Sequence, residues 1–574
     1  MATSTLLQVD DLQVSFLGET GWNPAVQQVS FTLEPGKTLG FVGESGSGKS
    51  VTSLALMNLL PQRQARIQAA QLLFDGRSLQ QLSGSAWSQL RGADMAMIFQ
   101  EPMTSLNPVY SCGYQVAEAI RAHGHIGRKA ARERVLQLFS KVQLPRVKEM
   151  YNAYPHQLSG GQKQRVMIAM AISCNPSLLI ADEPTTALDV TVQRGILDLL
   201  KDLQSETGMG MLFISHDLAV VAAMADHIAV MQKGRVVEQG TAEAIMRNPQ
   251  HPYTQSLLAC RPPHDVRLKR LPVVSEFLAG KWPGGEAQVR KELSLSAAER
   301  EAGHQEMYAQ APLLSVNNLK VWFPIKKTLF SRSAPMVKAV DGVSFQVYPG
   351  ETVGLVGESG CGKTSLGRAL LRLNEPEDGE IDFEGNKLIL LPDRQMRAFR
   401  KHIQIVFQDP YSSLNPRMSV GEAIKEPMTV HRLHGNESGR RQKVLELLQQ
   451  VGLDAAHYHR YPHEFSGGQR QRICIARALA VEPRLIVCDE SVSALDVSVQ
   501  AQVLNLLNSL KKALGLTFIF ISHDLAVVRF MSDRILVMKD GKIEETGEAD
   551  SLYHLPQKPY TKKLIAAIPG GYNV

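Results

Sequence analysis

The stretch GESGSGKS at Gly43–Ser50 decides the fold, because it has the spacing G-x-x-x-x-G-K-[ST] of a phosphate-binding loop. The apolar residues 39–42 before it predict a buried strand, and Val51–Leu60 after it predict a helix. Glycines let the backbone wrap closely around phosphate groups, and a helix N-terminus adds partial positive charge. The sequence therefore predicts a strand, loop and helix that hold the phosphates of a nucleotide.

The same stretch returns as GESGCGKT at Gly357–Thr364, and other segments of the chain also occur twice. IFQEPMTSLNP at residues 98–108 returns as VFQDPYSSLNP at 406–416, and YPHQLSGGQKQR at 154–165 as YPHEFSGGQRQR at 461–472. From the SGG segment onward each residue of the second copy is numbered 307 above its counterpart, as Ser159 and Ser466 illustrate. We therefore predict two copies of one domain, at residues 1–260 and 313–574, joined by a linker at residues 261–312.

Short apolar runs within each copy alternate with helical patterns. Leu178–Ala181 and Met211–Ile214 are fully apolar, as buried parallel strands are, and the alternation predicts an α/β fold with a mainly parallel sheet. The linker contains Pro262, Pro263 and a Pro-Gly-Gly run, followed by a charged helical pattern at residues 296–308. It is predicted to be a polar connection with one solvated helix.

Composition narrows the class of protein. Of 574 residues 44% are hydrophobic and 21% charged, which is typical of a soluble globular protein, and the net charge of +6 gives no argument for nucleic-acid binding. The six cysteines form no C-x-x-C pair, so zinc ribbons find no support and a reducing compartment is expected. We find neither a secretory signal nor an apolar run near the roughly 20 residues that span a bilayer. A membrane role is therefore expected through partners.

The two phosphate-binding loops give the first candidate site residues. Lys49 and Lys363 are expected to reach the β- and γ-phosphates of ATP, and the hydroxyls of Ser50 and Thr364 to ligate Mg²⁺. The expected ATP contacts are Gly43, Ser45, Gly46, Gly48, Lys49, Ser50 and Val51 in the first copy, and Gly357, Ser359, Gly360, Gly362, Lys363, Thr364 and Ser365 in the second.

Two carboxylates end an apolar strand in each copy, in LLIADE and LIVCDE. Asp182 and Asp489 are suited to hold Mg²⁺, and Glu183 and Glu490 to act as general base for the attacking water. A strand end is the alternative for such a pair taken alone. The separation from the SGG segment is the same in both copies, which favours the functional interpretation.

The SGGQ segments open a helical pattern with backbone N–H groups, a hydroxyl and no lysine, which indicates an anion site, with an ordinary helix cap as the alternative. Their residues are Ser159, Gly160, Gly161 and Gln162 in the first copy, and Ser466, Gly467, Gly468 and Gln469 in the second.

Together these motifs resemble those of ABC ATPases. The further members of the set are the Q-loop glutamines Gln100 and Gln408, the Ala-Leu-Asp segments at residues 187–189 and 494–496, and His216 and His523. The resemblance covers nearly the whole chain outside the linker and both extremities. It implies a tandem of P-loop NTPase domains, each with a helical subdomain. It also implies that the P-loop and strand-end carboxylates of one half (the Walker residues) face the SGGQ segment of the other half (the signature) across ATP.

The same resemblance assigns roles to the remaining residues. Gln100 and Gln408 would contact ATP and Mg²⁺, and His216 and His523 would act in catalysis at the γ-phosphate, although a lone histidine after a strand is more often structural. Phe16 and Phe323, in the repeated pattern L-x-V-x-F, are candidates to stack on adenine. Core strand residues are the alternative for both, and Trp22 is a rival in the first copy.

Three classes of ABC ATPase compete at this point: transporter subunits, ABC-F translation ATPases and DNA-repair ATPases. Repair enzymes carry zinc cysteines or long coiled coils, and ABC-F proteins a long charged helical linker, whereas this linker is broken by Pro and Gly. NPQHPYTQSLLA at residues 248–259 and LPQKPYTKKLIAA at 555–567 resemble the tails of peptide, oligopeptide and nickel importer ATPases. We expect an importer ATPase for small peptides such as glutathione, with microcin, dipeptide and nickel-opine importers as alternatives.

This resemblance also implies partners and a location. Two transmembrane permease subunits and a periplasmic or extracellular substrate-binding protein are expected, with no nucleic acid, at the cytoplasmic face of the bacterial inner membrane. Members of the group often ligate an iron–sulfur cluster with cysteines after the P-Y-T segment. This chain has Cys260 alone there in the first copy and none in the second, so we predict no such cluster. Cys361 lies at a helix N-terminus inside the second P-loop, where a reactive thiolate is expected.

Overall fold

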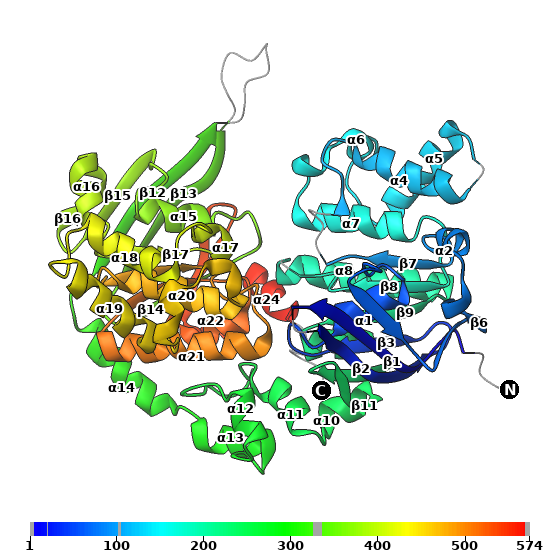
Figure 1. The fold of residues 1–574 in the computed structure, drawn as a ribbon. Coiled ribbons are helices and arrows are strands. Elements are labelled where there is room, and N and C mark those ends of the chain that lie inside the picture. The colour runs from blue at the N-terminus through cyan, green and yellow to red at the C-terminus, as the bar shows by residue number, and fades with distance from the viewer. Residues whose placement is uncertain are drawn as a thin grey trace. The chain divides into compact units, whose positions relative to one another are not determined.

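The computed structural model describes residues 5–19, 21–100, 105–124, 126–186, 188–324 and 336–568. Contacts divide the chain into two compact units, drawn in Figure 1. Of the described residues, unit 1 holds those up to Leu258 and Val274–Lys281, and unit 2 holds Ala259–Val273 and residues 282–568. Each unit is described by itself below.

Unit 1 alternates strands and helices in the order that the sequence predicts. Its elements are β1 (Leu7–Gly18), β2 (Gly21–Leu33), β3 (Thr38–Val42), α1 (Lys49–Leu56), β4 (Ala65–Gln68), β5 (Gln71–Phe74), β6 (Arg77–Ser78), α2 (Gly84–Leu90), β7 (Met95–Ile98), α4 (Cys112–His123), α5 (Arg128–Lys141), α6 (Val147–Asn152), α7 (Gly160–Ala171), β8 (Leu178–Asp182), α8 (Val190–Thr207), β9 (Gly210–Ser215), α9 (Leu218–Met224), β10 (His227–Gln232), β11 (Arg235–Thr241), α10 (Ala242–Arg247), α11 (Pro252–Ala259) and α12 (Val274–Leu278).

After two helices from the linker, unit 2 follows the same order, except that its described residues hold no strand matching β4 and no α-helix matching α6. Its elements are α13 (Gly285–Leu293), α14 (Ala297–Tyr308), β12 (Leu314–Pro324), β13 (Met336–Val347), β14 (Thr352–Val356), α15 (Lys363–Leu370), β15 (Asp378–Phe383), β16 (Asn386–Lys387), α16 (Asp393–Phe399), β17 (Ile403–Val406), α17 (Pro410–Ser413), α18 (Val420–Val430), α19 (Glu437–Gln450), α20 (Gly467–Leu479), β18 (Leu485–Asp489), α21 (Val497–Leu514), β19 (Thr517–Ile521), α22 (Leu525–Met531), β20 (Arg534–Lys539), β21 (Lys542–Glu548), α23 (Ala549–His554) and α24 (Pro559–Ala566).

The central sheet of each unit has six strands, in the order β11-β10-β3-β9-β8-β7 in unit 1 and β21-β20-β14-β19-β18-β17 in unit 2. All neighbours run parallel except the last hairpin, which is antiparallel. β3, β8 and β9 are buried on both faces, as continuous apolar runs require in a parallel sheet. The predicted α/β class is confirmed, and the carboxyl ends of β3, β8 and β9 lie at one edge of the sheet.

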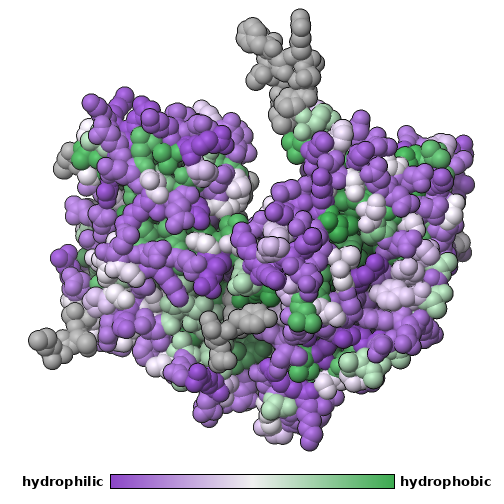
Figure 2. Space-filling view, turned by 180° about the vertical axis from the view of Figure 1, so that it is seen from behind, coloured by the Kyte–Doolittle hydropathy of each residue, from purple (hydrophilic) through white to green (hydrophobic). Residues whose placement is uncertain are grey.

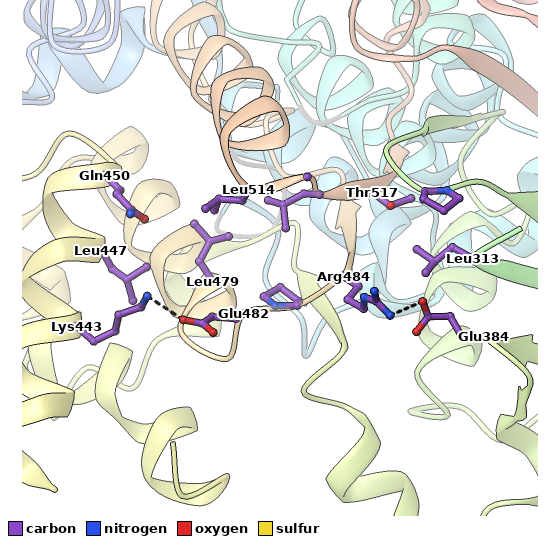
Figure 3. Close-up of a pocket in the computed structure, with 14 residues that line it drawn as sticks. Leu313, Glu384, Lys443, Leu447, Gln450, Leu479, Glu482, Arg484, Leu514 and Thr517 are labelled. Carbon is purple, nitrogen blue, oxygen red and sulfur yellow. Dashed lines mark hydrogen bonds and ion pairs between the residues drawn. The ribbon is translucent and has the colours of Figure 1, made fainter. Parts of the chain in front are cut away.

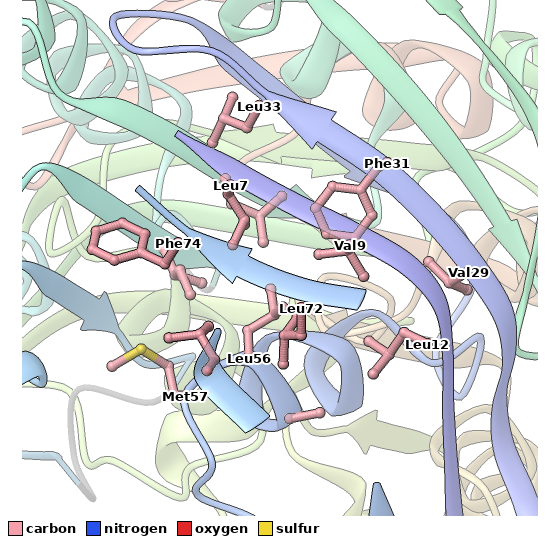
Figure 4. Close-up of a cluster of buried hydrophobic side chains, with 14 of the residues drawn as sticks. Leu7, Val9, Leu12, Val29, Phe31, Leu33, Leu56, Met57, Leu72 and Phe74 are labelled. Carbon is pink, nitrogen blue, oxygen red and sulfur yellow. The ribbon is translucent and has the colours of Figure 1, made fainter. Parts of the chain in front are cut away.

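A second, antiparallel sheet supplies much of the core of each unit. In unit 1 it is built on β1, β2 and β5, whose alternating apolar residues point to one side (Figure 4). Leu7, Val9 and Leu12 of β1 are fully buried beside Leu56 of α1, so this core fixes the helix that follows the P-loop.

Helices α4–α7 form a separate helical region in unit 1, and Figure 1 shows them grouped beyond the strands. Helices α18–α20 form the counterpart in unit 2. The SGGQ segment opens the last helix of each group, α7 and α20. The helical subdomain that the family resemblance implies is therefore present in both units.

Two sequence expectations need correction. The helix predicted at Val51–Leu60 is α1, which begins at Lys49 because Gly48 adopts a left-handed conformation there, and ends at Leu56. The linker was predicted to hold one solvated helix. That helix is α14, which buries no residue, but α12 and α13 are also present and bury Val274, Phe277 and Val289. Apolar residues spaced too sparsely for a periodic pattern anchor these two short helices.

The surface in Figure 2 is mostly hydrophilic, with apolar residues in separate patches. None of the described helices has the length and apolar character needed to cross a bilayer.

Candidate nucleotide site

The P-loop of unit 1 connects β3 to α1. Gly43 and Gly48 have φ angles of 157° and 102°, and a side chain on Gly43 would collide with the carbonyl oxygen of Met231. Only glycine fits both requirements. Lys49 is 4% exposed, and its Nζ donates to the carbonyl oxygens of Gly43 (2.7 Å) and Glu44 (2.9 Å).

The P-loop of unit 2 has the same geometry. Gly357 and Gly362 have φ angles of 156° and 107°. The Nζ of Lys363 donates to the carbonyl oxygens of Gly357 (2.8 Å) and Glu358 (3.0 Å). Both loops thus present a buried ammonium group and a helix N-terminus, a setting that favours a polyphosphate.

The aspartates predicted to hold Mg²⁺ meet the hydroxyls of the P-loops. Ser50 Oγ donates to Asp182 Oδ1 at 3.0 Å, and Thr364 Oγ1 donates to Asp489 Oδ1 at 2.9 Å. Burial, together with the charge of the adjacent glutamate, raises the pKa of Asp182 to about 6 and also raises that of Asp489. A hydroxyl and a carboxylate that converge beside a phosphate loop are the hard oxygen ligands that Mg²⁺ prefers. The residues present therefore fit this ion.

Glu183 follows the end of β8 in a left-handed conformation, with φ of 48°. Its own N–H donates to Ile214 O (2.9 Å), while Gln100 Nε2 donates to its Oε2 at 3.0 Å. His216 Nδ1 lies 3.3 Å from the same oxygen, and Thr186 Oγ1 donates to it at 2.8 Å. A non-glycine residue in this region costs about 1–3 kcal/mol, and such strain gathers at functional sites.

Unit 2 repeats this arrangement around Glu490, which also has a φ of 48°. Gln408 Nε2 donates to Glu490 Oε2 at 3.0 Å, and His523 Nδ1 lies 3.4 Å from it. Ser493 differs from its counterpart Thr186. The Thr186 hydroxyl donates to the carboxylate of Glu183, whereas the Ser493 hydroxyl donates to the backbone carbonyl oxygen of Glu490. The structure therefore brings together the predicted base, Q-loop glutamine and histidine in each unit.

The electrostatics of the glutamate and histidine are linked. Burial disfavours both charges, but the hydrogen bond and attraction between the two side chains outweigh it. The pKa of Glu183 is lowered and the pKa of His216 is raised. Burial likewise opposes the charge on His523, yet the contact with Glu490 raises its pKa. An ionised glutamate at this point can accept a proton from water.

The signature segments lie apart from these clusters within their own units. Ser159 caps α7, accepting from the N–H of Gln162 at 3.4 Å, and Ser466 caps α20 in the same way at 3.3 Å. The side chain of each glutamine accepts in return from the serine N–H. Both serines are exposed, so each capped helix end is open to a ligand.

The aromatic candidates differ in exposure. Phe16 is half-buried at the end of β1 and packs against the core cluster, whereas Phe323 is 38% exposed on β12. Trp22 is 39% exposed, with the Arg66 guanidinium 4.5 Å above its ring. These contacts leave both the stacking and the core interpretation of Phe16 open.

The expectation of a reactive thiolate at Cys361 is wrong. Its side chain is only 8% exposed, and this burial raises the pKa of the thiol despite the nearby Lys363. The helix N-terminus was a correct observation, but desolvation outweighs it.

Sequence reasoning also missed a contact made by the two P-Y-T segments. Tyr253 and Tyr560 each accept a hydrogen bond from a P-loop amide, those of Glu44 and Glu358, at 3.0 Å. The repeated P-Y-T letters marked these tyrosines, but no local pattern indicates that they reach a loop some 200 residues away.

Comparison with known families identifies the protein. The model described as ABC transporter matches residues 26–186 and 340–493, which is more than half of the chain. The chain belongs to the ABC transporter ATPases. As a member of that family it binds and hydrolyses ATP, and its partners are membrane permeases. A second model, described as the oligopeptide/dipeptide transporter C-terminal region, matches residues 237–277 and 545–571. The predicted kinship of the two P-Y-T segments with peptide transporters is confirmed.

Curated relatives agree with this family. The glutathione import ATP-binding proteins GsiA of Shigella sonnei (strain Ss046) and Escherichia coli (strain K12) are each 48% identical to this ABC ATPase over 98% of its chain and 89% of their own. A solved ATP-binding cassette, a post-hydrolysis dimer bound to ADP and Pi, is 29% identical with a TM-score of 0.38, covering 41% of this chain and 98% of its own.

Proposed function

We propose that this ABC ATPase drives the import of small peptides, with glutathione as the first cargo to test. Two observations, each made in both units, carry the proposal. A strained glutamate contacts a glutamine and a histidine in both units, and a segment of the oligopeptide/dipeptide transporter type follows each site. The relatives described as glutathione import proteins support the choice of cargo.

The chemistry proposed for each site follows from the contacts on its residues. In unit 1 the P-loop amides and Lys49 would bind the β- and γ-phosphates, and Ser50, Asp182 and Gln100 would hold Mg²⁺. The ion, when bound, neutralises charge on the phosphate oxygens. Glu183 would orient and deprotonate the attacking water, and His216 would contact the γ-phosphate. Lys363, Thr364, Asp489, Gln408, Glu490 and His523 would take these roles in unit 2.

We further propose that each site is completed by the signature of the other half. Ser466–Gln469 would close on the nucleotide of unit 1, and Ser159–Gln162 on that of unit 2. A capped helix N-terminus without a lysine suits this role, because it adds N–H donors and partial charge at the open side of the phosphates. Closure on ATP and reopening after hydrolysis would move the permeases, with ATP favouring the closed state by its differential affinity.

The proposed partners are two transmembrane permeases and a periplasmic or extracellular substrate-binding protein, and the proposed location is the cytoplasmic face of the inner membrane. The Q-loop region and the helical region of each unit would receive the permeases. Residues 101–104 of the first Q-loop lie outside the described residues. That the protein carries no iron–sulfur cluster stays a prediction.

Uptake of radiolabelled glutathione tests the proposal. A strain that lacks this gene would carry either the wild-type chain or the double variant Glu183→Gln/Glu490→Gln, at matched expression. We expect the wild type to restore ATP-dependent uptake and the double variant to fail. Inhibition of this uptake by unlabelled dipeptides, microcin-type peptides and nickel complexes would show which of these molecules the importer prefers.

Two results would count against peptide import. Uptake of glutathione and of every competing peptide that is the same with and without the gene would overturn it. Co-sedimentation of the chain with ribosomes, together with that result, would instead favour the ABC-F class.

A further inference from the structure

The segment that carries each P-Y-T motif is tied to the last hairpin of its own sheet. Glu238 of β11 accepts from the backbone N–H groups of Gln250 (2.7 Å) and His251 (3.1 Å). In unit 2, Glu545 of β21 accepts in the same way from residues 557 and 558, at 2.7 and 3.1 Å. These carboxylates fix where the helices α11 and α24 begin, and hence where their tyrosines lie.

Each tyrosine then reaches the P-loop of its unit. The hydroxyl of Tyr253 accepts from the N–H of Glu44, and that of Tyr560 from the N–H of Glu358, both at 3.0 Å. Tyr253 has no exposed surface and Tyr560 is 8% exposed. A buried hydroxyl that lost its partner would be left unsatisfied, so these contacts are specific parts of the fold.

The amide contacted by the tyrosine belongs to the same peptide group that the lysine contacts. The N–H of Glu44 and the carbonyl of Gly43 are the two ends of one planar peptide bond. Tyr253 accepts from the N–H end, and Lys49 donates to the carbonyl end at 2.7 Å. Tyr560 and Lys363 hold the corresponding peptide group of unit 2, with a lysine distance of 2.8 Å.

A peptide group at this place needs such restraint. Gly43 and Gly357 have φ near 157°, a conformation that glycine leaves easily because it lacks a Cβ. If the ammonium group turned toward phosphate on binding, the carbonyl end would lose this partner. The tyrosine contact at the other end would then keep the peptide plane in place.

We propose that Tyr253 and Tyr560 are positioning residues for the nucleotide: each hydroxyl locks the first peptide group of its P-loop, so that the loop and its lysine are preorganised for the phosphates of ATP. This inference rests on the proposed nucleotide sites. It makes Tyr253 and Tyr560, through their hydroxyls, part of the ATP sites of their units. Because the tyrosine hydroxyls contact the P-loop amides and the proposed bases are Glu183 and Glu490, the effect should fall on binding and spare the hydrolytic step.

Tyr253→Phe and Tyr560→Phe, singly and together, test the inference in the full-length chain. Phenylalanine keeps the ring and removes only the hydroxyl. We expect the affinity for a fluorescent ATP analogue with Mg²⁺ to fall about threefold to tenfold at the altered site, the loss of one neutral hydrogen bond. The KM for ATP of the double variant should rise by the same factor, and its kcat should stay within about twofold.

Two further variants separate the possible outcomes. Ser256→Ala removes a hydroxyl that donates to Tyr253 O (2.6 Å) on the same helix without touching the P-loop, and it should leave binding unchanged. Lys49→Ala/Lys363→Ala should lose binding. If it binds as well as wild type, the proposed nucleotide sites are themselves wrong, and this inference with them. If it loses binding while the double tyrosine variant binds like wild type, the inference alone is overturned.

Amide hydrogen exchange gives an independent readout that does not need nucleotide. The N–H of Glu44 should lose protection in Tyr253→Phe, and amides within α11 should keep theirs. A variant in which Glu44 keeps full protection contradicts the peptide lock even if ATP affinity falls.

Discussion

Unit 1 and unit 2 keep the same glutamine and histidine contacts to the proposed base, but they differ at positions of α9 and α22 and of α10 and α23. The Gln–Glu and His–Glu distances agree to 0.1 Å between Glu183 and Glu490. In unit 2, by contrast, the buried residues Arg529 of α22 and Tyr553 of α23 stand where unit 1 has Ala222 and Met246. The two copies thus share the chemistry and differ at these positions.

The divergent residues of unit 2 bind the linker. Arg529 Nε donates to Asp550 (2.5 Å) while its Nη1 donates to the carbonyl of His264, and the His264 ring lies 2.7 Å from the hydroxyl of Tyr553. Further along the linker, Leu271 exchanges two hydrogen bonds with Asn505, at 2.9 and 2.8 Å. Residues 261–273 of the linker therefore belong to unit 2 and are fixed to it by these hydrogen bonds.

The units also differ where the helical region meets the sheet. Unit 2 has a pocket of about 440 Å³ that is lined by leucines and by the ion pairs Lys443–Glu482 and Arg484–Glu384 (Figure 3). The counterpart in unit 1 measures about 70 Å³. Thr207 of the unit 1 pocket corresponds to Leu514 of the unit 2 pocket, so the two linings differ at this shared position.

The largest effect is expected when each proposed base is removed separately. Glu183→Gln and Glu490→Gln should each abolish hydrolysis at their own site, because general-base catalysis contributes about 10²–10⁴-fold. We expect each single variant to keep at most about half of the steady-state ATPase rate, and the double variant to fall by the full factor. An unchanged rate in either single variant would show that the two sites are not equivalent.

Arg529→Ala should destabilise unit 2 by about 2–4 kcal/mol, since it leaves buried Asp550 and two linker carbonyls with fewer partners. Hydrogen exchange across β20 and α23 would localise the loss to unit 2. The control is Arg194→Ala, whose exposed pair with Asp198 should be worth no more than about 0.5 kcal/mol. If both variants lose the same free energy of unfolding, Arg529 does not stabilise unit 2 through the linker.

Asp533→Asn should cost more stability than Asp226→Asn, its counterpart. Both carboxylates accept a backbone N–H at 2.8 Å and both pair with a lysine, Asp226 with Lys37 (3.0 Å) and Asp533 with Lys511 (2.9 Å). Asp533 is the more buried of the two and also faces His304 of the linker. We expect about 1–3 kcal/mol for Asp533, and a smaller loss for Asp226, whose side chain is 38% exposed. Urea unfolding of both variants measures the difference.

The pH dependence sharpens the same prediction. Burial disfavours the Asp533 charge, but Lys511 and the hydrogen bonds outweigh it and lower the pKa. A lowered folded-state pKa gives stability that is present above the unfolded pKa of about 4 and is lost as pH falls. The deficit of Asp533→Asn should therefore be full at pH 7 and narrow below about pH 4. A loss of stability in Asp533→Asn that grows as the pH falls would contradict this prediction.

The smallest effect is expected at Cys361, which occupies the position of Ser47. Cys361→Ser should leave the KM for ATP within about twofold, because serine already serves at this place in unit 1. Burial and a raised pKa should make alkylation of the wild-type thiol slow at pH 7 and faster at higher pH. Alkylation at pH 7 as fast as that of a free thiol would contradict the structure.

The sequence alone determined the phosphate-handling residues, because that chemistry needs fixed residue types at fixed spacing. Lys49, Asp182 and Glu183 were found from their motifs, and the repeat supplied their partners in the second unit. The α/β class followed in the same way from apolar runs alternating with helical patterns. The ends of helices were predicted less exactly. Helix α1 begins at Lys49, after Gly48 and before the first residue of its apolar pattern.

Only the tertiary structure showed which distant residues support those motifs. The hydrogen bond from Glu44 to Tyr253 joins residues 209 positions apart, and that from Leu271 to Asn505 spans 234. No local periodicity predicts either contact, because each joins segments that only the folded chain brings together. Desolvation at Cys361 is likewise a property of the packed neighbours. Local spacing fixes which groups perform chemistry, whereas packing fixes what holds them and how strongly they ionise.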